Sequence, residues 1–196
     1  MGKFKRIDTS IDGVYVIEPT VFGDNRGYFM ETYSEPDFEE IGIINKFVQD
    51  NQSKSKKGVL RGLHFQKKPK TQAKIVEVIS GAAIDVVVDM RADSPTYGKS
   101  TSVLLTPYNK DIEGSGRQLF VPRGFAHGFV SLEDDTVFQY LIDNDYAPET
   151  EGGILWNDPD LGINWEEIFE KYDIKEPLLS EKDQVHPRLV DSPKYF

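Results

Sequence analysis

Short apolar segments recur along most of the chain, and each is bounded by Gly, Pro, Asn, Asp or Ser. They are rich in Val, Ile, Phe and Tyr, the residue types that favour β-strands, and they have the length of strands. These segments lie at residues 13–18, 28–33, 46–50, 58–65, 73–79, 82–90, 100–106, 117–121, 126–131 and 136–142. The pattern predicts a protein built mainly of β-sheet.

Helical spacing is confined to two segments, residues 35–42 and 165–172. In the second, Trp165, Ile168 and Tyr172 recur at intervals close to whole helical turns. Because many short strands follow one another without long helices between them, the sequence predicts an all-β jelly roll of two sheets with a few short helices.

No internal repeat, low-complexity segment or linker divides the chain, so we expect a single domain over residues 1–196. A charged C-terminal tail from about residue 166 is the one candidate for an appendage. The segment YNKDIEGSGRQLF contains polar residues and glycines before an apolar stretch, and we expect a surface loop over residues 108–117.

The segment GVLRGLHFQ, at residues 58–66, has the composition of a buried strand yet carries Arg61 and His64. Side chains alternate between the two faces of a regular strand, which would make these two side chains diverge. Glycine inside a strand often marks a β-bulge, and a bulge at Gly62 would redirect a side chain into a site.

Three further polar residues stand in apolar rows of other predicted strands: Lys74, His127 and Tyr140. Each has an ordinary structural explanation, because a lysine at a strand end reaches solvent and a buried Tyr or His finds a hydrogen-bond partner. Together with His64 they favour a shared site, since histidine is the side chain that titrates near neutral pH. The third histidine, His186, lies in the charged tail and is expected to be exposed to solvent.

We expect no metal cofactor. His64 and His127 are far apart in the sequence, and neither has the neighbouring histidines and carboxylate that a metal site in a β-barrel uses. The sequence also lacks a glycine-rich phosphate loop and a G-x-S-x-G motif.

Composition narrows the class of protein further. The formal net charge of −10 argues against a nucleic-acid partner, because phosphate backbones bind basic surfaces. There is no run of about 18 apolar residues and no apolar leader, so we expect no membrane association. The chain has no cysteine, which fits a cytoplasmic location.

One part of the chain departs from this acidic average. Residues 51–76 contain no Asp or Glu, and their basic residues are Lys54, Lys56, Lys57, Arg61, Lys67, Lys68, Lys70 and Lys74. Such a segment is either a solvated loop or a local positive field for an anionic small molecule.

Long segments of the chain resemble, in collinear order, the dTDP-4-dehydrorhamnose 3,5-epimerase family. They are VFGDNRGYFMETY, FVQDNQSKSKKGVLRGLHFQ, AKIVEVISGAAIDVVVDMRADSPTYGK, RQLFVPRGFAHGFVSL, GGILWNDPDLGINW and LLSEKDQ. The resemblance implies a cupin-type jelly roll (double-stranded β-helix), a homodimer, no metal or organic cofactor, and a dTDP-4-keto-6-deoxyhexose substrate.

The resemblance also implies the chemistry, which is epimerisation of dTDP-4-dehydro-6-deoxy-D-glucose at C3 and C5 to dTDP-4-dehydro-L-rhamnose. Such a reaction removes a proton beside the ketone and returns one on the opposite face. By resemblance His64 is the base, Tyr140 the acid, Asp183 orients His64, and Lys74 stabilises the enolate oxygen. The reverse roles of His64 and Tyr140 stay open for one of the two carbons.

For substrate binding, the resemblance carries over a set of residues that hold the nucleotide and the sugar. Tyr146 would stack on the thymine, Arg61 would bind the diphosphate, and His127 would lie near the sugar. The whole set is Phe22, Arg26, Glu31, Gln49, Asn51, Arg61, His127, Tyr146, Glu151 and Lys182.

Two alternatives remain. One is an epimerase that inverts a single carbon, C3 or C5, of a related dTDP-4-keto-deoxysugar. The other is a sugar-nucleotide-binding cupin without activity, against which the presence of His64, Lys74, Tyr140 and Asp183 together argues.

Overall fold

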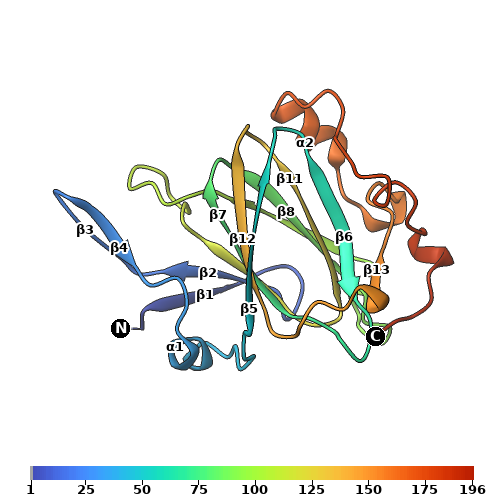
Figure 1. Cartoon of the computed structure of the whole chain (residues 1–196), viewed down its shortest axis with the longest axis horizontal. Helices are drawn as coiled ribbons and strands as arrows, with labels where there is room; N and C mark the ends of the chain where they lie inside the picture. Colours follow the sequence, from blue (N-terminus) through green and yellow to red (C-terminus); the bar gives the residue numbers. More distant parts are fainter. Residues whose placement is uncertain (1) are drawn as a thin grey trace.

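The computed structural model describes residues 2–196 and consists of two antiparallel sheets that face each other, with a hairpin that projects from one end (Figure 1). The six-stranded sheet has the order β1 (Phe4–Asp8), β2 (Tyr15–Pro19), β10 (Gln118–Val121), β7 (Lys74–Ser80), β12 (Thr136–Ile142) and β5 (Gln49–Ser55). The five-stranded sheet has the order β13 (Glu151–Gly153), β6 (Leu60–Gln66), β11 (Phe125–Ser131), β8 (Ala83–Asp89) and β9 (Ser100–Leu105). This arrangement confirms the all-β jelly roll that the sequence predicts.

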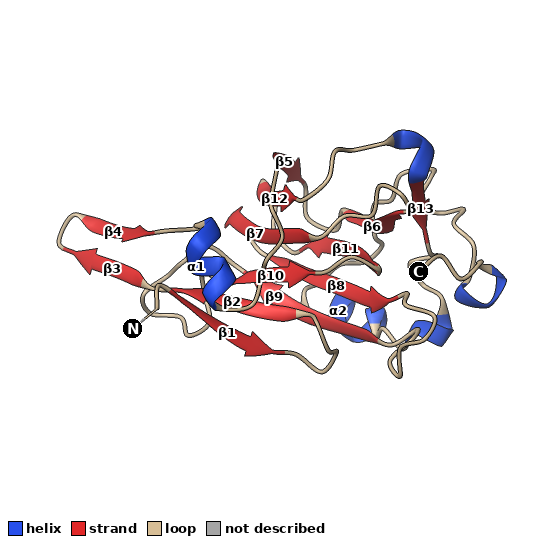
Figure 2. Cartoon of the chain, turned by 90° about the horizontal axis from the view of Figure 1, so that it is seen from below, coloured by secondary structure: helices blue, strands red, loops and turns tan. Residues whose placement is uncertain are grey.

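Helices are short and lie outside the sheets (Figure 2). They are α1 (Glu35–Glu40), α2 (Trp165–Lys171) and three 3-10 turns, η1 (Pro148–Thr150), η2 (Pro159–Leu161) and η3 (Leu189–Asp191). None of the helices within residues 2–196 has the length and apolar character needed to cross a bilayer.

The interior between the two sheets is apolar over most of its area. Val76 and Phe138 from the six-stranded sheet pack with Val87 and Phe129 from the five-stranded sheet, and the rings of Phe129 and Phe138 stack with centroids 4.0 Å apart. Removing these side chains from water is the main force that holds the sheets together.

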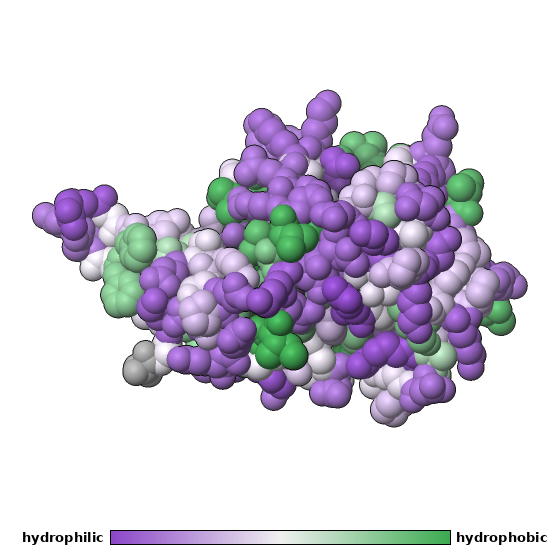
Figure 3. Space-filling view, turned by 60° about the horizontal axis from the view of Figure 1, so that its bottom comes forward, coloured by the Kyte–Doolittle hydropathy of each residue, from purple (hydrophilic) through white to green (hydrophobic). Residues whose placement is uncertain are grey.

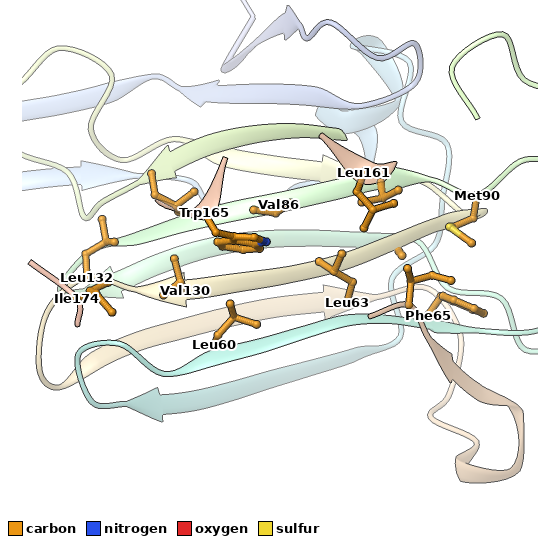
Figure 4. Packing of buried hydrophobic residues seen from close by; sticks show 14 of the residues in the cluster. Leu60, Leu63, Phe65, Val86, Met90, Val130, Leu132, Leu161, Trp165 and Ile174 are labelled. Carbon is orange, nitrogen blue, oxygen red and sulfur yellow. The ribbon is translucent and has the colours of Figure 1, made fainter. Parts of the chain in front are cut away.

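The outer face of the five-stranded sheet is also covered. The closing segment, residues 154–196, lays Trp165, Leu161 and Ile174 over β6, β8 and β11 (Figure 4). Strands β8 and β11 are therefore buried on both faces, and their sequences are apolar runs instead of alternating patterns. The tail that the sequence suggests as an appendage thus packs against the core.

Strand β6 contains a β-bulge at Gly62, the position where a glycine interrupts the predicted strand. Residues 61 and 64 of β6 pair with residues 129 and 127 of β11, so β6 has one more residue than its partner over this stretch. Leu60 and Leu63 consequently share the outer cluster, and Arg61 and His64 both point to the interior. The bulge is confirmed.

Glycine is required at this position. Gly62 has φ +129°, and a Cβ placed there would lie 2.6 Å from the Cα of Gly128 and 2.9 Å from the carbonyl oxygen of His127. The strands therefore approach too closely for a side chain.

Most predicted strands are present, with shifts at their ends. The strand predicted at residues 46–50 instead begins at Gln49 and runs to Ser55, and the one predicted at 28–33 ends at Met30. Strands β1, β3 (Val21–Asp24) and β13 were not predicted. The predicted helices occur at α1 and α2, and residues 108–117 form a loop as expected.

Candidate active site

A cavity of about 280 Å³ opens between the two sheets, and all four predicted catalytic residues line it. An adjoining cavity of about 290 Å³ shares His64, Lys74 and Tyr140 with it, so the two form one continuous site. The first is also lined by Arg61, His127, Lys182 and Asp183, and the second by Gln49, Asn51, Tyr146 and Glu151.

Strand register brings these side chains together. In the six-stranded sheet, Tyr140 of β12 lies opposite Asn51 of β5, and Lys74 of β7 lies opposite Ile142 of β12. In the five-stranded sheet, His64 of β6 lies opposite His127 of β11. The site thus receives its tyrosine and its lysine from one sheet and two of its histidines from the other.

The closing segment brings Asp183 to His64. It is fixed at the start of β6 by backbone hydrogen bonds, in which the Leu178 N–H donates to the Gly58 carbonyl (2.8 Å) and the Leu60 N–H donates to the Leu178 carbonyl (3.0 Å). A few residues later, Asp183 Oδ1 lies 2.5 Å from His64 Nε2.

Asp183 is held as a carboxylate. Its side chain is almost fully buried, and Ser180 Oγ donates to its Oδ2 at 2.9 Å. Burial alone would raise the pKa of Asp183, but the hydrogen bonds from His64 and Ser180 outweigh it and hold the pKa below the usual range. A carboxylate at Nε2 fixes a proton on that nitrogen and leaves Nδ1 of the neutral ring as the atom that can accept a proton.

A second histidine and carboxylate pair lies deeper. The His127 Nε2–H donates to Asp85 Oδ2 at 2.8 Å, and both residues are buried. Burial lowers the pKa of His127 and raises that of Asp85, and each partner's charge opposes the other's shift. The Asp85 carboxylate lies close enough to Lys74 to act on the pKa of its amine, which it raises.

Lys74 and Tyr140 occupy a desolvated part of the cavity. Burial lowers the pKa of Lys74 to about 8, although Asp85 and Glu151 oppose the shift. Burial raises the pKa of Tyr140, so its hydroxyl keeps its proton at neutral pH. Lys74 Nζ lies 6.0 Å from the centre of the Tyr140 ring, so a cation and a proton donor face the same space.

The mouth of the site carries the groups that resemblance assigns to the nucleotide. Lys182 forms an ion pair with Glu151, and the hydroxyl of the exposed Tyr146 donates to Glu151 Oε2 at 2.9 Å. The Arg61 guanidinium donates to Ser55 Oγ through Nε at 3.3 Å. Two cations in the first cavity and a half-exposed aromatic ring in the adjoining one suit a diphosphate and a base.

Three predicted binding residues lie elsewhere. Phe22 and Arg26 belong to the projecting arm, which we define as β3 (Val21–Asp24), β4 (Gly27–Met30) and the turn between them. Arg26 forms an ion pair with Asp24 at 2.6 Å, and Glu31, just after the arm, pairs with Lys3 at 2.9 Å. None of the three lines the cavity around His64.

The prediction that His186 is exposed is wrong. Only 11% of its side chain is accessible, and its ring lies edge-on to that of His64 with centroids 5.4 Å apart. Burial lowers its pKa, which favours the neutral ring. His64, Asp183 and His186 together offer three atoms suited to a metal ion, a grouping that the spacing of His64 and His127 did not indicate.

Asp85 and Ser180 are two further residues at the site that were not predicted from the sequence. The acidic residue in the middle of the largely apolar run AAIDVVVDM was a signal for Asp85, because a buried carboxylate needs a partner. No comparable local signal marks Ser180, whose position depends on how the closing segment packs.

Comparison with known proteins identifies the family of the chain. The family model described as dTDP-4-dehydrorhamnose 3,5-epimerase matches residues 8–191. The enzyme of that name from Methanothermobacter thermautotrophicus is 47% identical over 196 residues, which cover 100% of both chains.

Solved structures share the fold. The dTDP-6-deoxy-D-glucose-3,5-epimerase of Legionella pneumophila, in complex with dTDP-4-keto-L-rhamnose, has a TM-score of 0.85 and 40% identity, and the match covers 97% of this chain and 95% of that one. A 3′-monoepimerase from Streptomyces bikiniensis, in complex with dTDP-quinovose, has a TM-score of 0.79 and 34% identity over 93% of this chain and 86% of that one. With a family model that spans nearly the whole sequence and a relative that matches it from end to end, the chain belongs to the dTDP-4-dehydrorhamnose 3,5-epimerase family.

Proposed function

We propose that the protein inverts C3 and C5 of dTDP-4-dehydro-6-deoxy-D-glucose to give dTDP-4-dehydro-L-rhamnose. The observation that carries the proposal is the His64–Asp183 pair at 2.5 Å, which shares one cavity with Tyr140 and Lys74. Membership of the epimerase family supports the same reaction.

Each inversion is a proton exchange beside the C4 ketone. His64 Nδ1 accepts the proton from the carbon, and the electrons of that C–H bond form the enolate, whose negative charge lies on the C4 oxygen. The Lys74 ammonium stabilises this charge, because a cation in a desolvated cavity interacts more strongly than in water. Tyr140 then donates a proton to the opposite face of the carbon, and no electron is gained or lost, so the residues need no redox cofactor.

His64 remains effective as a base because Asp183 balances the charge that it acquires. The buried carboxylate lies at Nε2, and Ser180 and the fold of the closing segment fix its position. An imidazolium formed during proton transfer is therefore paired immediately. His127, paired with Asp85, would lie near the sugar and donate no proton to the carbon centres in this scheme.

The nucleotide occupies the mouth of the site in this proposal. Arg61 and Lys182 hold the diphosphate, Tyr146 stacks on thymine, and Gln49 and Asn51 donate hydrogen bonds to the nucleoside. Glu151 orients Lys182 and Tyr146, with both of which it is already bonded.

The protein acts as a homodimer in this proposal, because three expected binding residues are on or beside the arm and away from the cavity of their own chain. The arm exposes Phe22, Tyr28 and Phe29, each with more than half of its surface accessible. Figure 3 shows the arm at the left as a lobe with hydrophobic surface beside a hydrophilic tip. An exposed apolar lobe of this kind favours an isologous contact in which each arm reaches the partner's cavity.

Mixed dimers test the arm exchange. Two variants, Arg26→Ala and His64→Ala, should each lose most activity as homodimers. Heterodimers purified through two different tags should recover about half of the wild-type activity, because one of their two sites then has both native residues. If each arm served its own cavity, every site would carry one substitution and the heterodimer would stay inactive.

Proton NMR in deuterium oxide tests the chemistry. The wild-type protein should introduce deuterium at both C3 and C5 of dTDP-4-keto-6-deoxyglucose, relative to a sample without protein. His64→Ala should abolish exchange. Tyr140→Phe should still exchange from the face of His64 but not invert the carbon, and both variants should bind dTDP normally.

The outcomes separate the assignments. Exchange in His64→Ala together with none in Tyr140→Phe would reverse the roles of base and acid. Loss of dTDP binding in either variant would reject their assignment as proton-transfer groups. Exchange at one carbon alone would support the second candidate, a monoepimerase, which the similarity to the Streptomyces bikiniensis enzyme favours.

A further inference from the structure

His186 lies where it can act on the proposed base without touching the sugar. Its Nε2 is 4.0 Å from Asp183 Oδ1, and its ring meets the edge of His64. His186 Nε2 is buried, yet it has no hydrogen-bond partner among residues 2–196. Burying a polar atom without a partner is unfavourable, and a ligand bound to this nitrogen would remove that penalty.

The position of His186 is built into the fold. A Cβ at Gly153 would lie 2.5 Å from His186 Nε2 and 2.6 Å from its Cε1, so the ring rests directly on the backbone of β13. Gly153 is also the register partner of His64. The absent side chain on β13 therefore provides the space that brings the second imidazole beside the first.

The three groups form a compact set of ligand atoms. One nitrogen from His64, one carboxylate oxygen from Asp183 and one nitrogen from His186 all lie within 4.8 Å of one another. Ligand atoms around tetrahedral zinc lie about 3.3 Å apart, given bonds of about 2.0–2.2 Å. Shifts of about 1 Å in the side chains would therefore give zinc geometry, with the fourth position open to solvent.

We propose that His64, Asp183 and His186 form a Zn²⁺ site, and that zinc bound there reversibly inhibits the enzyme. Two imidazoles and one carboxylate are a donor set typical of zinc, whereas Mg²⁺ and Ca²⁺ prefer oxygen ligands alone. The adjacent positive charge of Lys182 is offset by its ion pair with Glu151.

Inhibition follows from the position of one proton. Zinc binds when the single proton of the neutral His64 ring moves, by exchange with solvent, from Nε2 to Nδ1, and the metal takes the lone pair that this leaves on Nε2. The neutral ring then carries its one proton on Nδ1 and has no lone pair with which to accept a proton from the sugar. No oxidation or reduction takes place, and a chelator that removes zinc restores the base. This inhibition rests on the proposed function, whereas zinc binding itself does not.

Direct binding tests the site. Calorimetric titration of the dimeric, substrate-free protein with ZnCl₂ should give one site per chain with micromolar or better affinity. His186→Gln should weaken binding by at least about tenfold, because one ligand is lost. His127→Gln is the matched control, since it removes the other buried histidine, and it should bind zinc as the wild type does.

A second variant keeps the test valid if His186→Gln does not fold. Gly153→Ala retains all three ligands but displaces the His186 ring, so it should also weaken zinc binding at least about tenfold. Equal zinc affinity in the wild type and in whichever of these two variants folds would overturn the site.

Activity assays test the inhibition separately. Zinc should lower the wild-type exchange rate over the same concentrations that saturate the calorimetric site, and EDTA should restore it. Stoichiometric binding without loss of rate would overturn the inhibition. A protein that bound zinc but had no activity on the dTDP-sugar even after EDTA would refute the proposed function and leave the zinc site in place.

Discussion

Replacing Gly62 with alanine tests whether the bulge in β6 positions both Arg61, which we propose binds the diphosphate, and His64, the proposed base. The new Cβ would lie 2.6 Å from Gly128 Cα and 2.9 Å from the His127 carbonyl oxygen, and both contacts are with backbone. Neither atom can move without displacing β11, so strand β6 itself must shift.

The expected cost has three parts. A side chain at φ +129° costs about 1–3 kcal/mol in backbone strain. Overpacking against β11 adds about 1–3 kcal/mol. Alanine also lowers the conformational entropy of the unfolded chain, which stabilises the folded state by about 0.4–1 kcal/mol. The net loss of unfolding free energy should be about 3 kcal/mol, a large share of the total for a domain.

Urea unfolding of Gly62→Ala beside Gly27→Ala measures this loss. Gly27 has φ +136° but no neighbour within 4 Å of a new Cβ, so that variant has the backbone strain without the close contact. The difference between the variants should be about 1–3 kcal/mol. Under conditions where Gly62→Ala is folded, its kcat should fall and its KM should rise together, because His64 and Arg61 move with one strand. Equal stability of the two variants, or a folded Gly62→Ala with wild-type kinetics, would refute the role given to the bulge.

Four further outcomes are expected. The turnover number should fall as pH rises through about 8, because Lys74 then loses the charge that stabilises the enolate, and Lys74→Arg should move this fall to higher pH in a kcat–pH profile. The pKa of Lys74 in the folded state lies below the usual 10.5, so between pH 8 and 10.5 the folded protein binds fewer protons than the unfolded chain. The unfolding free energy should therefore rise from pH 8 to 10.5. Lys74→Met should remove this slope in urea titrations. Arg61→Gln should weaken dTDP binding by about 10- to 100-fold in calorimetry, because losing a charged hydrogen bond costs about 1.5–3 kcal/mol. An unchanged affinity would show that Arg61 does not bind the diphosphate. Trp165→Ala should lower the unfolding free energy by about 3–5 kcal/mol, because the buried indole fills the outer cluster; a loss below 1 kcal/mol would show that the closing segment adds little to stability.

The strands and the fold class could be predicted because their signal is local. A strand that is covered on one face is apolar at alternate positions. A strand that is covered on both faces, such as the one in AAIDVVVDM, is apolar at most positions. The bulge could also be anticipated, since Gly62 interrupts a strand that carries two polar residues. Both inferences depend on residues that are neighbours in the sequence.

Strands that were missed, or predicted with displaced ends, have no such signal. Strand β13 is formed by Glu151 and two glycines, and its structure comes from pairing with β6. Strand β5 has the polar sequence QDNQSKS because it lies at the sheet edge, where it contributes Gln49 and Asn51 to the cavity. The polar residues that line the cavity therefore take the place of the apolar pattern by which a strand is recognised.

The position of the base depends in turn on the least strand-like part of the chain. The closing segment covers the outer face of the five-stranded sheet with Trp165 and is tied to the start of β6 through Leu178. It then delivers Asp183 to His64 and His186 to Gly153, residues far away in the sequence. Because the same segment both completes the core and holds the carboxylate that pairs with His64, the proposed base, a substitution that loosens its packing should lower activity before the sheets unfold. This coupling explains why a charged segment with little apparent pattern has to be an integral part of the jelly roll.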